Sequence, residues 1–323
     1  MKPDILRKIL FNMKRIRVVE EEIARRYPEG KMRCPTHLAV GQEAVAAAVG
    51  LALNSSDLVV SGHRAHAHYL GKGGDLKAML AEIYGKITGC SRGKGGSMHL
   101  IDESVGFMGS TAIVGGTVPV GVGLAYGMKV RKSSQVSCVF HGDAVVETGA
   151  FFESANFAIL KELPVLFVCE NNLYSVYSPL SVRQPEKRSI AAMISGLGMP
   201  AFSIDGNDPC LIYEKTQNAL AAIREGGGPM FLELSTYRWL EHCGPFYDNH
   251  IGYRSEEEFL EWQGAEPISR LQSQLVENCI ISKRELQDME ESIACEVEDA
   301  FAFAEGSSMP AAETAFTGLY YQQ

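Results

Sequence analysis

Apolar residues recur every three or four positions near the start of the chain. The positions are Ile5, Ile9, Met13, Ile16, Val19 and Ile23, with Lys and Arg between them. This spacing predicts one amphipathic helix over residues 3–26, whose apolar stripe must cover another element. The alanine-rich stretch 36–53 predicts a second helix. From residue 57 a short apolar strand runs into a polar turn that contains several histidines.

The stretch 89–118 has little periodic apolar signal and is dense in Gly and Ser. It predicts a long loop inside a compact domain, and such loops are usually functional. Residues 119–130 then predict a helix rich in small residues, which are Gly121, Gly123, Ala125 and Gly127. Because glycine is costly in a helix, we expect another helix to pack closely against this one, either in the same chain or in a second subunit.

From residue 135 to 236, apolar strands alternate with amphipathic helices. The predicted strands lie near 135–143, 163–172, 201–206 and 228–236, and the helices near 148–162, 188–196 and 211–227. This alternation predicts an α/β fold with a mostly parallel sheet and helices on both of its faces. A polar loop follows residue 240, and after it only helices are expected, the last beginning with a capping box formed by Ser282 and Glu285.

Composition narrows the classes of function. The net charge of −9 argues against a nucleic-acid surface, because phosphate backbones are bound by clustered Lys and Arg. The eight cysteines include no C-x-x-C pair, so neither a zinc ribbon nor a dithiol redox motif is expected. The N-terminus lacks the apolar core of a signal peptide, and no run approaches eighteen apolar residues. These features predict a cytoplasmic protein without a membrane span.

Two polar residues follow neighbouring predicted strands. Asp143 ends the first strand and Asn172 ends the second, 29 positions later. In a β-α-β unit both would lie at the carboxyl edge of the sheet, where open α/β folds bind ligands. Carboxylate and amide oxygens suit Mg²⁺, and the helix that begins near Gly149 directs free backbone N–H groups toward an anion at this edge. The pair therefore predicts a site for Mg²⁺ and a diphosphate.

Three other interpretations compete with this one. Asp143 and Asn172 are also ordinary turn residues, because Asp and Asn after strands form Asx turns. A dinucleotide-binding loop is disfavoured because the stretch 115–123 has no G-x-G-x-x-G and no clear preceding strand. A zinc site formed by His63, His66 and His68 is also disfavoured, since these histidines are expected to be hydrogen-bonded loop residues.

Several motifs resemble a known family. They are "THLAVGQEA" (36–44), "HRAHAHYLGKGGD" (63–75), "GCSRGKGGSMH" (89–99), "AIVGGTVPVGVG" (112–123), "GDAVVETG" (142–149), "LPVLFVCENNLYSV" (163–176), "TYRWLEHC" (236–243) and "GYRSEEE" (252–258). Together they resemble the alpha subunit of thiamine-diphosphate-dependent 2-oxo acid dehydrogenases of the pyruvate and acetoin types. The resemblance implies a thiamine-diphosphate-binding fold in a single domain, with a core over about 30–255, the N-terminal helix 3–26 and a helical tail over 256–323.

The resemblance also implies roles for individual residues. The metal ligands would be Asp143, the Asn172 side chain and the Tyr174 backbone carbonyl. The remaining cofactor-binding positions would be Arg64 at the diphosphate, Val114 as an apolar wedge that bends the cofactor, backbone contacts from Ala112, Gly142, Ala144 and Val145, and the active-site histidine His242. The catalytic candidates are His242 and, as a second, His66.

The alternating pattern gives way to helices, so we expect no second α/β domain in this sequence that could supply the glutamate that activates the cofactor in this superfamily. By resemblance, that glutamate comes from a beta subunit in an α2β2 assembly. The implied reaction is decarboxylation of a small 2-oxo acid and transfer of the acyl group to a lipoyl domain. A carbon–carbon bond-forming or acyl-transfer enzyme of a dedicated biosynthetic pathway, and a non-catalytic scaffold subunit, are the alternatives.

Two positions depart from the family pattern. Ala144 stands where the motif normally has glycine, so we expect a methyl group close to the diphosphate and no easy access to positive φ. Cys243 stands where many relatives have a phosphorylated serine, so control of that kind is not expected. The stretch 244–254 is also longer than in pyruvate enzymes, which leaves the substrate open.

Overall fold

The computed structural model describes residues 1–318, and the last five residues of the predicted tail lie outside this range. Its centre is one six-stranded sheet in which all neighbouring strands are parallel. Across the sheet the strands are β2 (Phe107–Ser110), β1 (Leu58–Ser61), β3 (Ser137–Gly142), β4 (Val165–Asn171), β8 (Met230–Ser235) and β7 (Ala201–Asp205). The predicted parallel α/β architecture is therefore confirmed.

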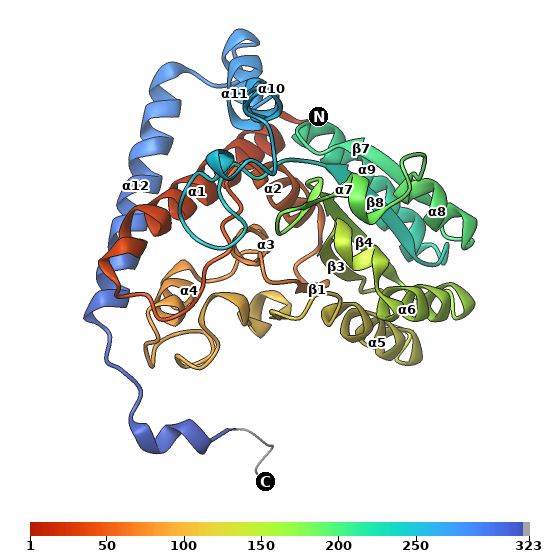
Figure 1. Ribbon diagram of the computed structural model, residues 1–323, viewed down its shortest axis with the longest axis horizontal. Helices are drawn as coiled ribbons and strands as arrows, with labels where there is room; N and C mark the ends of the chain where they lie inside the picture. The colour runs from red at the N-terminus through yellow and green to blue at the C-terminus, as the bar shows by residue number, and fades with distance from the viewer. Residues whose placement is uncertain (319–323) are drawn as a thin grey trace.

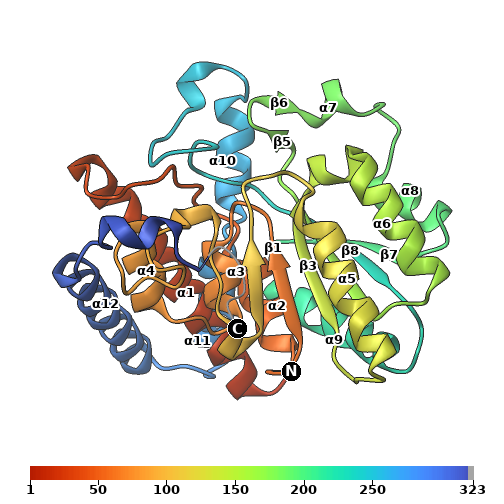
Figure 2. The ribbon, with the colours of Figure 1, turned by 90° about the horizontal axis from the view of Figure 1, so that it is seen from below.

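Helices cover both faces of this sheet (Figures 1 and 2). One face packs against α5 (Thr117–Val130), α6 (Gly149–Leu160) and α8 (Ile190–Gly196). The other packs against a layer that contains α1 (Pro3–Arg26), α2 (Glu43–Ala52), α3 (His66–Gly71), α4 (Leu76–Ile83) and α9 (Pro209–Arg224). Alternate strand residues such as Val139 and Phe140 enter opposite cores, as the period of two requires.

The tail is helical, as predicted. It consists of α10 (Glu256–Gly264), α11 (Pro267–Glu277) and α12 (Lys283–Gly306). Ser282 and Glu285 form the expected capping box at the start of α12. Figure 1 shows α12 lying along the outer side of α1, and the two helices are in contact. No helix in the described range combines the length and the apolar character needed to cross a membrane.

The helix predicted over 36–53 is wrong in its first third, because α2 begins only at Glu43. Gly41 has a φ of +96°, which is incompatible with a right-handed helix. A side chain at this position would also meet the Tyr237 carbonyl oxygen at 2.5 Å. Residues 36–42 are therefore extended loop, and they approach the segment that follows β8.

The histidine-bearing segment after β1 is not a simple turn, because His66 and His68 lie in the short helix α3. The predicted loop 89–118 contains the edge strand β2, which pairs with β1. Helix α5 contacts another helix, α6, as predicted, but its glycines serve a different contact. A side chain at Gly121 would meet the strand residues Val139 and Val60, so this glycine permits close helix–sheet packing, whereas Gly123 faces open space.

A buried carboxylate organises the loop that precedes β2. Glu82 of α4 accepts hydrogen bonds from the backbone N–H groups of Ser91, Gly93, Gly95 and Gly96, at distances between 2.6 and 3.0 Å. Glu82 is fully buried. These four hydrogen bonds to one carboxylate fix the conformation of a segment whose sequence has no periodic apolar pattern and so predicts neither helix nor strand.

Two small elements follow β4 and precede α8. They are the hairpin of β5 (Tyr174–Ser175) with β6 (Ser178–Pro179) and the single turn α7 (Leu180–Arg183). The hairpin begins two residues after Asn172 and contacts the 3-10 helix Asp143–Glu147, which follows β3.

Candidate active site

A cavity lies at the carboxyl edge of the sheet. Residues from the ends of β1, β3 and β4 line it together with the start of α5 and the loop after β8. Register explains the juxtaposition, because Gly142 of β3 pairs with Glu170 of β4. Asp143 is therefore level with Asn171, Asn172 lies one residue further along, and both Asp143 and Asn172 line the cavity.

The side chains of the proposed metal ligands are buried. Asp143 is 2% exposed and Asn172 is 8% exposed. The Asn172 amide donates to Gln42 Oε1 at 3.1 Å, and its oxygen accepts from the Tyr174 backbone N–H at 3.3 Å. These contacts orient the amide oxygen, and the Tyr174 backbone lies directly beside it. Asn172 therefore does form the Asx turn of the first rival interpretation. This turn does not prevent its amide oxygen from binding a metal ion.

Asp143 already has a cationic neighbour. The guanidinium of Arg183 in α7 donates to the Asp143 carboxylate and, at 2.6 Å, to Glu147. Burial raises the pKa of Asp143 above its usual range, and the charge of Arg183 opposes that rise. The site therefore has a carboxylate whose charge requires a positive partner.

Arg64 lines the cavity from the segment after β1. Its guanidinium donates to the carbonyl oxygens of Leu38 and His242. Burial lowers the pKa of Arg64 to about 10, so the side chain remains charged at neutral pH. This buried cation favours an anionic ligand in the cavity.

The other predicted cofactor positions also meet at this cavity. Ala112, Val114, Gly142, Ala144, Val145, Tyr174 and His242 all line it. Val114 is 48% exposed although it is apolar, as a side chain that contacts a ligand would be. Ala144 lies in a short 3-10 helix (Asp143–Glu147), and its φ is not among the positive values of the non-glycine residues. The concern that alanine strains this backbone is therefore removed.

His66 is the exception among the predicted site residues, because it does not line the cavity. Its two ring nitrogens contact Glu20 Oε1 at 3.1 Å and Ser97 Oγ at 2.8 Å, and the side chain is fully buried. Helix α3 directs it toward α1 and the glycine-rich loop. This placement does not support a direct catalytic role for His66.

His242 lies in the histidine loop, which we define as residues 236–255. Burial, followed by the charge of Arg64, lowers the pKa of His242 to about 3. The imidazole is therefore neutral at physiological pH, with a lone pair on one ring nitrogen and an N–H on the other.

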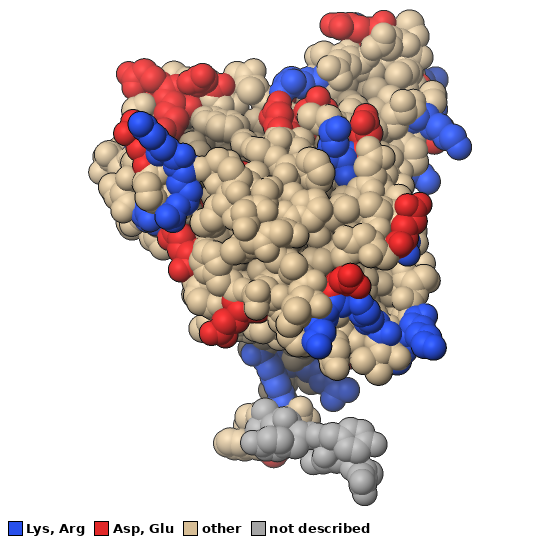
Figure 3. Space-filling view, turned by 90° about the vertical axis from the view of Figure 1, so that its right-hand side faces the viewer, with Lys and Arg blue, Asp and Glu red and all other residues tan. Residues whose placement is uncertain are grey.

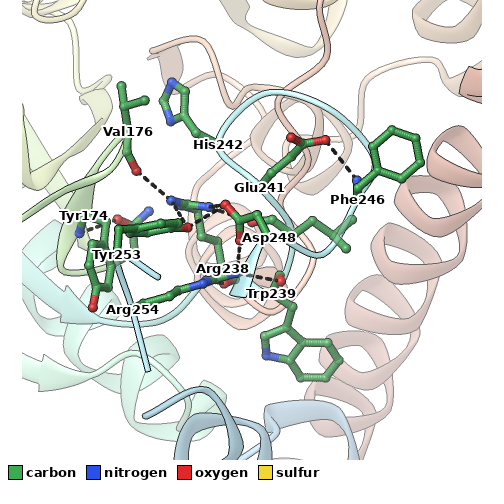
Figure 4. A network of polar contacts seen from close by, with 12 residues as sticks. Tyr174, Val176, Arg238, Trp239, Glu241, His242, Phe246, Asp248, Tyr253 and Arg254 are labelled. Carbon is green, nitrogen blue, oxygen red and sulfur yellow. Dashed lines mark hydrogen bonds and ion pairs between the residues drawn. The ribbon is translucent and has the colours of Figure 1, made fainter. Parts of the chain in front are cut away.

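Buried ionic contacts hold the histidine loop in place (Figure 4). Asp248 accepts from Arg254 at 2.6 Å and from the Tyr253 hydroxyl at 2.7 Å. Arg238 donates to Tyr253 at 2.8 Å and, across to the β5–β6 hairpin, to the Val176 carbonyl at 2.8 Å. The loop with His242 and the segment with Tyr174 are thus parts of one network.

Tyr174 also reaches the tail. Its hydroxyl donates to the Glu258 carboxylate of α10 at 2.7 Å, and the Tyr237 hydroxyl donates to the same oxygen at 2.8 Å. Glu258 therefore connects the proposed metal segment, the histidine loop and the helical tail.

Two cavity residues and one neighbour of the cavity were not identified from the sequence. Gln42 and His37 line the cavity, where Gln42 orients Asn172 and His37 lies beside His63 and His242. Arg183 pairs with the cavity residue Asp143. Gln42 and His37 lie within the motif "THLAVGQEA", which was the only signal available for them. Nothing in the sequence around Arg183 distinguishes it from other loop cations.

Unpaired polar atoms indicate that the cavity suits a polar ligand. His37 Nδ1, Gln42 Nε2 and His141 Nε2 are buried, and within the described chain none has a hydrogen-bond partner. Buried polar groups are normally satisfied, so a ligand with several acceptor atoms fits these surroundings. The carboxylate, amide and carbonyl oxygens at the strand ends form a hard-oxygen donor set, which fits Mg²⁺.

The sequence profile of the family described as "Dehydrogenase E1 component" matches residues 11–313. The chain belongs to this family. It is 35% identical over 305 residues to the pyruvate dehydrogenase E1 component subunit alpha of Rickettsia bellii, covering 94% of this chain and 92% of that protein. It is also 35% identical over 309 residues to the alpha subunit of the acetoin:2,6-dichlorophenolindophenol oxidoreductase of Bacillus subtilis, with 95% and 91% covered.

The match to a plant relative covers a smaller share of that relative's length. The chloroplastic pyruvate dehydrogenase E1 component subunit alpha-3 of Arabidopsis thaliana is 36% identical over 300 residues, which cover 91% of this chain and 69% of that protein. The family identified from the motifs is thereby confirmed, and with it the interpretation as an oxidoreductase component. Membership implies thiamine diphosphate as the cofactor, and the alpha-subunit names imply a beta-subunit partner.

Proposed function

We propose that this chain binds the Mg²⁺–diphosphate end of thiamine diphosphate and that, with a beta subunit, it decarboxylates a small 2-oxo acid. The acyl group then passes to a lipoyl group. The observation that carries the proposal is the convergence of Asp143, Asn172 and Tyr174 with the buried cation Arg64 in one cavity. Bound thiamine diphosphate would supply the carbanion chemistry, and the protein supplies binding and orientation.

The residues of this chain divide that task. Asp143, the Asn172 amide oxygen and the Tyr174 carbonyl would hold Mg²⁺, which takes oxygen ligands in octahedral geometry. Arg64 and the N-terminus of α6 would attract the diphosphate. Val114, Ala112, Gly142, Ala144 and Val145 would form the surface against which the cofactor lies.

His242 would act on the substrate side of the cavity. As a neutral imidazole it can accept a proton or a hydrogen bond from a reacting group. The ionic network of the histidine loop fixes His242 relative to the β5–β6 hairpin. The beta subunit would supply the glutamate that activates the cofactor.

The cytoplasmic location expected from the sequence stays a prediction.

The first test is Asp143→Asn in the chain assembled with its beta subunit. We expect loss of saturable, Mg²⁺-dependent thiamine diphosphate binding in calorimetry, because an amide cannot replace the charge of the carboxylate. The circular dichroism spectrum should not change, since Asp143 lies at a strand end. Glu103→Gln, at an exposed carboxylate of the preceding loop, is the control. Normal cofactor binding by Asp143→Asn would show that the metal site is assigned wrongly.

The acyl acceptor is tested separately. We expect oxidation of pyruvate or another small 2-oxo acid with an artificial electron acceptor, and acylation of a lipoyl domain. Production of a carbon–carbon coupled product from an added aldehyde, without lipoyl acylation, would instead support the biosynthetic alternative.

A further inference from the structure

Three histidines from separate segments meet at the wall of the cavity. His37 precedes α2, His63 follows β1, and His242 belongs to the histidine loop. Their ring centroids lie 4.6, 4.9 and 5.3 Å apart, with the rings edge to face. One nitrogen from each can be chosen so that all three lie within 4.8 Å of one another.

The cluster contains a ring nitrogen without a partner. His66 uses both of its ring nitrogens in contacts with Glu20 and Ser97. Within residues 1–318, His37 Nδ1 is buried without a hydrogen-bond partner, as are His68 Nε2 and His141 Nε2 elsewhere in the cavity lining. The cluster therefore contains a buried ring nitrogen that the fold itself does not use.

The three imidazoles are neutral at physiological pH. Burial is the main cause, and it lowers the pKa of His37 to about 2, of His63 to about 4 and of His242 to about 3. A metal ion binds the deprotonated ring, so no proton has to leave when an ion enters.

The dimensions suit a tetrahedral ion. Zinc binds histidine nitrogen at about 2.0–2.1 Å, which places the nitrogens of a tetrahedral site about 3.4 Å apart. Since the nitrogens are already within 4.8 Å, each ring has to move by about 1 Å or less. Three histidines with one open position form a zinc ligand set, and imidazole also suits Cu²⁺ and Ni²⁺, whereas Mg²⁺ prefers oxygen.

Arg64 opposes a cation at this position. Its charge contributes to the low pKa of His37, His63 and His242, and the same repulsion would act on a metal ion. A hydroxide or carboxylate in the fourth position reduces the net charge of the metal from two to one, which halves that repulsion. Arg64 also directs its guanidinium at backbone oxygens rather than into the cluster.

We propose that His37, His63 and His242 form a binding site for a zinc-class transition-metal ion, separate from the Mg²⁺ site at Asp143. An ion bound there would take up the imidazole nitrogen of His242 that acts on the substrate, and it would inhibit the enzyme. The binding rests on the histidine geometry alone, whereas the inhibition rests on the function proposed above.

Cobalt titration of the full-length chain tests the binding. We expect one equivalent of Co²⁺ to produce the intense visible bands of tetrahedral cobalt, and Zn²⁺ to displace them. His37→Gln and His63→Gln should each weaken binding by more than the roughly 10- to 100-fold that loss of an outer hydrogen-bonding partner costs at a metal site. Two variants are needed because either could fail to fold, which circular dichroism would reveal.

Two controls exclude other ligands. Cys243→Ser removes the exposed thiol beside His242, and His250→Gln removes an exposed histidine of the same loop. Both should keep the cobalt spectrum of the unaltered chain, without a thiolate charge-transfer band. The proposal is wrong if folded His37→Gln and His63→Gln bind cobalt as the unaltered chain does, or if Cys243→Ser abolishes binding.

Inhibition is measured on the complex with the beta subunit. Micromolar Zn²⁺ should reduce 2-oxo acid oxidation, a chelator should restore it, and residual activity of His63→Gln should be less sensitive. Binding without inhibition would overturn the regulatory half of the proposal alone. A complex without any thiamine-dependent activity would contradict the proposed function, and the cobalt spectrum would still decide the site.

Discussion

Arg183 and the proposed metal require the same carboxylate. The guanidinium pairs with Asp143 and is anchored at 2.6 Å by Glu147, while its Nε donates to the Ser178 carbonyl at 3.1 Å. A guanidinium and Mg²⁺ cannot both approach the same oxygen atoms closely. With Mg²⁺ bound at Asp143 as proposed, Arg183 would compete with it for the carboxylate and would have to move away, with Glu147 as its remaining partner.

Replacement of this cation gives the first residue-scale prediction. In Arg183→Gln, the Mg²⁺ concentration needed for half-maximal thiamine diphosphate binding should fall several-fold, because the competing charge is gone. Calorimetric titrations of cofactor at stepped Mg²⁺ concentrations measure this value. Lys187→Gln, at an exposed position of the same segment, should leave it unchanged. A rise in Arg183→Gln would instead indicate that the guanidinium contacts the bound diphosphate.

The buried histidines predict a pH dependence of stability. An unfolded imidazole has a pKa near 6.5, whereas that of folded His37 is about 2. Below pH 6.5 the unfolded state therefore binds a proton that the folded state does not. The free energy of unfolding should fall with falling pH, by about 1.4 kcal/mol per pH unit for each such histidine.

Comparison of two proteins isolates this effect. The free energies of unfolding of the unaltered chain and of His37→Gln can be measured in urea at pH 6.5 and pH 5. The variant should lose less stability between these values, since Gln does not titrate. Carboxylates with raised pKa such as Asp143 act in the opposite direction, but they are common to both proteins. Equal losses would show that His37 protonates in the folded state.

At the scale of elements, the fold depends on Glu82 to shape an otherwise irregular loop. Glu82→Gln keeps the size of the side chain but presents an NH2 group to two of the four backbone donors. We expect a loss of about 3 kcal/mol in the free energy of unfolding, because hydrogen bonds to a charged group contribute about 1.5–3 kcal/mol each. Urea unfolding checks the value, with Glu103→Gln as the control. A change under 0.5 kcal/mol would contradict the role of the carboxylate.

The elements that sequence patterns predicted well are those with a strong period. Helix α1 begins and ends at the expected residues, and β3, α6 and β4 follow the expected alternation. Strand β2 was missed because its four residues include Gly109 and follow a polar loop. The start of α2 was missed because Gly41 adopts its positive φ only when the segment after β8 packs against it.

Some residues of the candidate site could be predicted from the sequence, and others could not. Asp143 and Asn172 could be predicted because each directly follows a buried strand, and strand order alone brings them together. Tertiary contacts between distant segments bring other residues to the site. Arg183 contacts Asp143, His37 lies beside His63 and His242, and Glu258 contacts Tyr174. His66 was the second catalytic candidate, but helix α3 directs it toward Glu20 and Ser97 and away from the cavity.

At the scale of the whole molecule, one helical face remains apolar and exposed. It comprises Val120, Tyr126 and Val130 of α5 with Phe152, Phe157 and Leu160 of α6. Figure 3 views the right-hand side of Figure 1, the side on which α6 and α8 lie, and shows few charged side chains over its centre. Exposed apolar side chains gathered on one face are typical of an interaction site, and we expect the contact with the beta subunit to cover them.

A charge within this face should weaken the assembly. Val130 is 65% exposed, so Val130→Glu should leave the circular dichroism spectrum unchanged while it shifts the complex with the beta subunit toward free chains in sedimentation velocity. Leu260→Glu is the matched control, because Leu260 is 54% exposed in α10, away from this face. An intact complex in Val130→Glu would show that other surfaces form the subunit contact.

The Glu258 carboxylate gives the tail a role beyond packing. It accepts hydrogen bonds from Tyr174, whose backbone belongs to the proposed metal segment, and from Tyr237 of the histidine loop. Coupling between two sites is reciprocal, so whatever fixes Tyr174 must strengthen the attachment of α10 by the same free energy. Helix α10 would then report, through its own resistance to local unfolding, whether the cofactor site is filled.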